Sequence, residues 1–153
     1  MSEQLKDKIF KAQSEGDIAS LFMLEKEAHE SFDEEMLHAY YANILDLALE
    51  RLTDALEGPR KMDFDDVQDF ATIRALYEYA IEHYSSEKLN DASALFEVLS
   101  GISNSTEFSN AMKIHVKAIN EAISLDDFIE KIADVDATEA SGTFYLSKFQ
   151  EAV

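Results

Sequence analysis

The sequence predicts an all-α protein, and three observations lead to this prediction. Apolar residues recur at spacings of three and four through most of the chain, which is the period of an amphipathic helix. Four Gly and one Pro are too few for a β-sandwich, which needs frequent turns. No stretch of useful length alternates apolar and polar residues as a strand would. The 153 residues are expected to form one domain of about seven to eight helices, arranged as stacked antiparallel pairs or as an irregular bundle.

Capping signals divide the N-terminal part, residues 1–57, into helices. A first helix over residues 3–14 is expected to stop at Gly16, because glycine is preferred just past a helix end. Asp17 is expected to cap the short helix that follows.

The longest predicted helix covers residues 33–57. It follows the run SFDE at residues 31–34, a capping box with Ser31 as the cap. Gly58 and Pro59 together indicate its end. Its apolar stripe is the most regular of the chain and comprises Leu37, Tyr41, Ile44, Ala48, Leu52 and Leu56.

The remaining part, residues 63–153, is predicted to consist of helix pairs after a linker at residues 60–62. One helix begins near residues 63–66 and runs to about residue 84, and the next begins at Leu89. The run NSTE forms a capping box for a third helix, with Asn104 as the cap.

The C-terminal residues give weaker signals. Ser124 is expected to cap a further short helix. Residues 135–142 are expected to be a polar connector. A terminal helix is predicted to carry the apolar residues Phe144, Tyr145, Leu146 and Phe149.

The helix pairs show a weak internal repeat. The positions of Leu89, Ala92, Phe96 and Leu99 recur 36 residues later as Leu125, Phe128, Ile132 and Val135. Helix–turn–helix units of about 34 residues are typical of tetratricopeptide proteins. In this comparison Glu87 occupies the usual glycine position of the turn, and Asn104 the usual proline position after the pair. Adjacent helices of a plain bundle would give the same phasing by chance.

One stretch supports a narrower resemblance. Residues 76–96, LYEYAIEHYSSEKLNDASALF, are similar to the first repeat of the type III secretion chaperones that escort translocator proteins. The resemblance implies a small, acidic, cytoplasmic all-α protein with an N-terminal dimerisation region ahead of tetratricopeptide-like repeats. A homodimer is therefore an expected oligomeric state.

If the helix pairs form a solenoid, the first helix of each pair lines an extended groove. The residues expected on that face occupy one stripe of each first helix. Aromatic rings would hold apolar anchors of a peptide, while lysines and amides would orient it. In the alternative interpretation, the aromatic residues only cover the N-terminal helices. The predicted partner-binding residues are Arg74, Tyr77, Ile81, Tyr84, Asn110, Lys113, Lys117 and Asn120.

Charge and composition exclude several classes of partner and chemistry. A net charge of −19 argues against binding to a nucleic-acid backbone or to an anionic membrane. With zero Cys there is no disulfide, thiol nucleophile or Cys-ligated metal. Glu35 and His38 form a single E-x-x-H motif, whereas a di-iron bundle needs two. His115 lies on an apolar face, as a buried histidine would. No catalytic residue, metal ligand or cofactor is predicted, and an enzyme is not expected.

These observations favour a small, acidic helical module in the cytoplasm. It is expected to hold a segment of another protein, or a basic protein surface, as an adaptor or secretion-type chaperone does. Two alternatives remain: an oligomerising structural bundle without a peptide groove, and an acidic mimic of nucleic acid.

Overall fold

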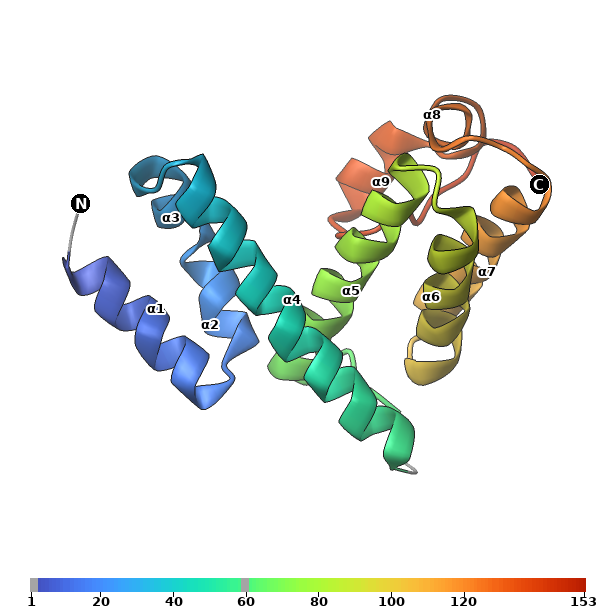
Figure 1. The fold of residues 1–153 in the computed structure, drawn as a ribbon. Coiled ribbons are helices and arrows are strands. Elements are labelled where there is room, and N and C mark those ends of the chain that lie inside the picture. The colour runs from blue at the N-terminus through green and yellow to red at the C-terminus, as the bar shows by residue number, and fades with distance from the viewer. Residues whose placement is uncertain (1–2, 59–60) are drawn as a thin grey trace.

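The computed structural model describes residues 3–58 and 61–153, and this part of the chain is all-α, as predicted (Figure 1). Pro59 and Arg60, which the sequence assigns to a helix end and a linker, lie outside the described residues. A π-helical turn at Phe128–Ile132 follows α8. The α-helices are α1 (Glu3–Glu15), α2 (Ile18–Met23), α3 (Glu25–Ser31), α4 (Glu34–Glu57), α5 (Val67–Ser85), α6 (Leu89–Ile102), α7 (Thr106–Asn120), α8 (Leu125–Asp127) and α9 (Val135–Ser141).

The N-terminal helices begin and end largely where the capping signals place them. Gly16 has a φ of +65° just after α1, and the Asp17 side chain accepts a hydrogen bond from the Ser20 amide at 3.0 Å. The predicted Ser31 cap is wrong, because Ser31 is the last residue of α3. Asp33 caps α4 instead and accepts from the Met36 amide at 2.8 Å.

Helix α5 lies at the centre of the molecule. It packs against α2 and α4 on one side and against α6 on another, as Figure 1 shows. Because neighbours cover α5 on several sides, its buried residues do not form a single stripe. They are Asp69, Ala71, Thr72, Ile73, Ala75, Leu76, Tyr77, Ala80 and Tyr84.

The long helix α4 contributes the other large part of the core. The centre of its predicted stripe is buried at Ile44, Ala48 and Leu52, but Tyr40 takes the place expected for Tyr41. The predicted burial is wrong at the C-terminal end of the stripe, where the Leu56 side chain is 57% exposed. The Tyr40 hydroxyl donates to the Leu21 carbonyl and so ties α4 to α2.

Polar side chains join the first helices to the start of α5. The Gln68 amide nitrogen donates to Asp17 Oδ1 at 2.5 Å, and its oxygen accepts from the Ala19 amide at 3.2 Å. Asp69 is buried and pairs with Arg51 of α4 at 2.7 Å. These contacts fix the position of α5 relative to α2 and α4.

The turn between α5 and α6 and the turn after α7 have the same backbone geometry. Glu87 and Ala122 both have a φ of +62°, a left-handed conformation that favours glycine. The amide after each of these residues donates to the carbonyl five positions earlier, at 2.9 and 3.0 Å respectively. Glu87 thus has a backbone conformation that glycine adopts more readily than other residues. The second capping box is wrong in its cap, because Ser105 caps α7 and accepts from the Phe108 amide.

The last twenty residues differ from the sequence prediction. The expected connector at residues 135–142 contains α9, which Asp134 caps by accepting from the Ala137 amide at 3.0 Å. The predicted terminal helix is wrong, since residues 143–153 contain no helix. Instead the Thr138 hydroxyl accepts from the amides of Ser147 and Lys148 at 3.3 and 3.1 Å. An isolated antiparallel bridge joins Ala133 to Phe149.

Candidate functional site

The residues predicted to bind a partner do not form one exposed groove. The two tyrosines whose rings are expected to contact a partner peptide are core residues, because Tyr77 is 4% exposed and Tyr84 is 2% exposed. Arg74 and Ile81 are partly exposed on α5. The other four residues lie at the surface of α7, and they are Asn110, Lys113, Lys117 and Asn120.

Tyr77 is buried by the C-terminal end of its own chain rather than by the N-terminal helices. Its ring lies 5.9 Å from the ring of Phe144 and 6.2 Å from that of Tyr145. Its hydroxyl oxygen accepts from the Leu146 amide at 3.1 Å and lies 2.9 Å from Nε2 of His115. The C-terminal segment, defined here as residues 143–150, therefore covers one of the predicted partner-binding residues, Tyr77.

Tyr84 connects the two helix turns. Its hydroxyl donates to the Ile123 carbonyl at 2.6 Å, just after the left-handed residue of the second turn. Its ring also contacts those of Phe96 and Phe128. Tyr84 thus stabilises the packing of the helix pairs.

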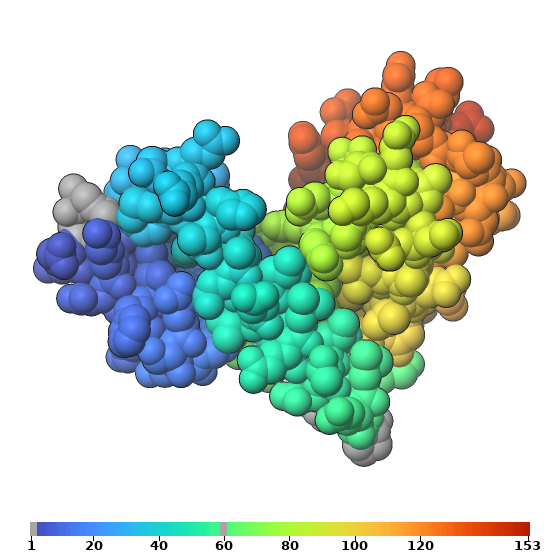
Figure 2. Space-filling view, viewed as in Figure 1, coloured from blue at the N-terminus to red at the C-terminus, as the bar shows by residue number. Residues whose placement is uncertain are grey.

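An open cavity between α4 and α5 has a different character. We call it the α4–α5 notch. Figure 2 shows the surface hollowed between these two helices. Its volume is about 160 Å³, and its wall combines apolar, tyrosine and glutamate side chains. The lining residues are Phe22, Tyr41, Ile44, Leu45, Ala75, Glu78, Tyr79 and Glu82.

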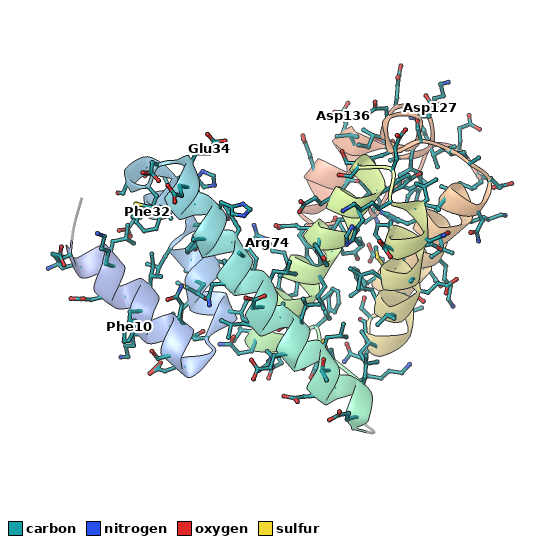
Figure 3. All side chains as sticks on the ribbon, viewed as in Figure 1. Phe10, Phe32, Glu34, Arg74, Asp127 and Asp136 are labelled. Carbon is teal, nitrogen blue, oxygen red and sulfur yellow. The ribbon has the colours of Figure 1, made fainter. Side chains whose placement is uncertain are left out.

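Arg74 lies at the edge of this notch, between α4 and α5 in Figure 3. Its guanidinium contacts Glu25 at 3.2 Å and Glu78 at 3.4 Å, and its carbon Cζ lies 4.1 Å from the centre of the Phe22 ring. The charge of the guanidinium is stabilised by the carboxylates and by the face of the aromatic ring.

The carboxylates of the notch are not equally paired. Partial burial raises the pKa of Glu78, while the neighbouring Arg74 lowers it. Glu82 lies one turn later on α5, and within the described residues its carboxylate forms no hydrogen bond or ion pair. Arg74 therefore pairs with Glu25 and Glu78, whereas Glu82 has no cationic partner among the described residues, which leaves an excess of negative charge at the notch.

Tyr41 lines the α4 side of the notch, across from the residues of α5, and two polar contacts hold it in place. Its hydroxyl donates to Glu25 Oε2 at 2.5 Å and lies 2.7 Å from Nε2 of His29. Since the hydroxyl has only one proton, His29 Nε2 must donate to it. The ring of Tyr41 is thereby fixed, and we find no sequence signal that would have placed it opposite Tyr79.

Other features of the described residues offer less chemistry. A second open cavity, of about 510 Å³, lies between the two helix turns, and its charged lining residues are Glu87 and Asp126. In residues 3–58 and 61–153 no group of three or more His, Asp or Glu side chains could hold a metal ion. Glu35 and His38 are both exposed on α4. None of the helices in these residues is long and apolar enough to span a bilayer.

Comparison with known proteins gives no relative: no family model, no curated protein and no solved structure matches this chain significantly.

Proposed function

We propose that this chain is a small acidic protein-binding module that holds a basic segment of a partner protein at the α4–α5 notch. The observation that carries the proposal is the combination of two tyrosine walls, an apolar floor and the unpaired carboxylate of Glu82 in one open cavity. Aromatic faces attract cations, and a carboxylate accepts their hydrogen bonds. The chemistry of the notch therefore suits the side chain of a lysine or an arginine.

The size of the notch supports one side chain as the occupant. Small-molecule sites generally measure about 300–1,000 Å³, whereas the notch measures about 160 Å³. Arg74 is an example, within this protein, of a basic side chain bound in this way: its guanidinium lies over Phe22 beside Glu78. The net charge of −19 would attract a basic partner over a longer range.

Narrower parts of this proposal rest on the geometry of the two turns and on the sequence. The two matching left-handed turns favour tetratricopeptide-like helix pairs. The chaperone role, the homodimer and the cytoplasmic location rest on the resemblance of residues 76–96 to secretion chaperones.

The proposal can be tested with a fluorescein-labelled peptide, Gly-Arg-Gly-Arg-Gly, and the same peptide with neutral citrulline in place of arginine. Fluorescence anisotropy should show binding of the arginine peptide to the purified protein. The double variant Tyr79→Ala, Glu82→Gln should weaken this binding about tenfold, as expected for loss of a cation–π contact and an ion pair.

A matched variant separates the notch from the general negative charge. Glu97→Gln removes one exposed carboxylate from α6, outside the notch, and should change the affinity less than about twofold. If Glu97→Gln weakens binding as much as the notch variant does, or if the citrulline peptide binds equally well, the proposal is wrong.

A further inference from the structure

The C-terminal segment packs as an irregular stretch of chain against helices α5 and α7. It contains no helix, and its aromatic side chains make the principal contacts with these helices. We call the surface beneath it the α5–α7 face. It comprises Phe70 and Tyr77 of α5, Phe108 and His115 of α7, and Phe64 from the turn before α5.

Two adjacent residues anchor the segment. The Phe144 ring lies 5.2 Å from that of Phe70 and 5.9 Å from that of Phe108. The Tyr145 ring meets Phe108 edge-on at 4.9 Å. Such offset and edge-to-face pairs are favourable beyond the area they bury. Phe149 makes a third contact, 6.4 Å from the His115 ring.

Main-chain bonds hold the segment mostly to its own neighbours. The Asp134 amide donates to the Lys148 carbonyl, and the Gln150 amide to the Ile132 carbonyl, both at 2.8 Å. Within the part of the chain that the structure describes, one main-chain group of the segment bonds to the α5–α7 face, namely the Leu146 amide to the Tyr77 hydroxyl. The face itself belongs mainly to helices whose backbone bonds do not involve the segment.

The segment leaves part of this aromatic surface open. Phe70 is still 39% exposed although its ring contacts Phe144. Gly142 precedes the segment with a φ of +75°, and a Cβ built on it would meet no atom within 4 Å. The space that a side chain at this position would occupy is therefore open.

We propose that the α5–α7 face is a second binding site, for a non-helical partner segment that carries two adjacent aromatic residues followed by an aliphatic one. The C-terminal segment, with Phe144, Tyr145 and Leu146, is the intramolecular occupant of that site. This site is separate from the α4–α5 notch and does not depend on it. An attached segment competes at an effective concentration of about millimolar, so a partner binds well only when the segment is released.

The test uses the full chain and a fluorescein-labelled peptide of residues 142–153. Two variants weaken the attached segment in different ways. Phe144→Ala, Tyr145→Ala removes its anchors, whereas Thr138→Val removes the hydroxyl that accepts from Ser147 and Lys148. Both variants should bind the labelled peptide at least tenfold more tightly than the unchanged protein does.

Two controls define the specific result. The peptide with Phe144→Ala and Tyr145→Ala should not compete with the labelled peptide. The protein variant Phe10→Ala, Met23→Ala loses two exposed apolar side chains at the opposite end of the molecule (Phe10 in Figure 3) and should bind the peptide as the unchanged protein does. Circular dichroism establishes that each variant is folded.

The proposal is overturned if the folded variants bind the peptide no better than the unchanged protein. It is also overturned if both variants unfold, because the segment would then be an inseparable part of the core. If only the anchor variant unfolds, the Thr138→Val result decides the question.

Discussion

The hydroxyl of Tyr77 lies 2.9 Å from Nε2 of His115, and this contact joins α5 to α7 inside the core. On the other side of the ring, Nδ1 of His115 lies 2.6 Å from the Ala111 carbonyl. Since a carbonyl only accepts, Nδ1 carries the proton and Nε2 accepts from Tyr77. The Tyr77 oxygen in turn accepts from the Leu146 amide. In this series of hydrogen bonds, each polar atom has a partner only while His115 is neutral.

Stability should consequently fall as the pH is lowered from 6.5 to 4. Burial lowers the pKa of His115 to about 4 in the folded protein, against 6.5 when it is exposed. Between these values the unfolded chain binds a proton that the folded chain does not, so the free energy of unfolding decreases with falling pH. The expected loss is about 3 kcal/mol. Urea unfolding at several pH values measures it.

His115→Gln separates this effect from that of other groups, because glutamine does not titrate. Glu78, whose pKa is raised by burial, opposes the loss, and Asp17, whose pKa is lowered by its bonds to Gln68 and Ser20, adds to it at lower pH. Both carboxyls remain in the variant. An equally steep pH dependence in His115→Gln would show that His115 is not its source.

Replacing the buried tyrosines should destabilise the fold. Tyr77→Ala and Tyr84→Ala should each cost about 3–5 kcal/mol, because each leaves a cavity and unpaired polar groups. The Phe10→Ala control should change stability by less than about 0.5 kcal/mol, since Phe10 is 70% exposed. Thermal melts followed by circular dichroism test this. Unchanged melting of the Tyr77 variant would mean that the ring is exposed in solution.

Helix α4 offers a comparison between two positions of one predicted stripe. Ile44→Asp places an unpaired charge at a site that is 2% exposed, and should cost about 3–5 kcal/mol. Leu56→Asp lies three turns later at an exposed site and should cost less than about 0.5 kcal/mol. Chemical denaturation of both variants gives the difference. Equal losses would contradict the burial pattern of α4.

Glycine should stabilise the two left-handed turns. At positive φ, a residue with a Cβ destabilises the folded state by roughly 1–2 kcal/mol. Glycine avoids this strain, but it loses more conformational entropy on folding, which costs about 0.5–1 kcal/mol. Glu87→Gly and Ala122→Gly should therefore each raise the free energy of unfolding by about 0.5–1 kcal/mol. Glu87→Ala, which keeps the Cβ, should give no such gain. A lower melting temperature for both glycine variants would contradict the turn geometry.

Local signals account for the helices that the sequence predicts correctly. Caps and apolar spacing identify α1, α2, α4, α5, α6 and α7, and the Ser124 cap identifies α8, because these features act within a few residues. Helix α9 also has such signals, in Asp134 as cap and Gly142 just past its end. The predicted connector rests on the polar composition of residues 135–142, which a short exposed helix also has.

The rest depends on contacts between distant residues. Phe144, Tyr145, Leu146 and Phe149 are apolar because they pack on α5 and α7, and their spacing is not that of one helical face. Likewise, the groove prediction for Tyr77 and Tyr84 assumed an uncovered side of α5. The α4–α5 notch brings together Tyr41 and Tyr79 from two helices, which no spacing along the sequence reveals.

The central position of α5 has a consequence for hydrogen exchange. Its backbone amides are covered by α2 and α4 on one side and by α6 on another. Opening α5 therefore uncovers the apolar surfaces of both ends of the molecule at once, which costs nearly as much as complete unfolding. The amides in the middle of α5 should exchange with solvent deuterium only through global unfolding. Those of α1 and α9, at the periphery, should exchange through smaller, local openings.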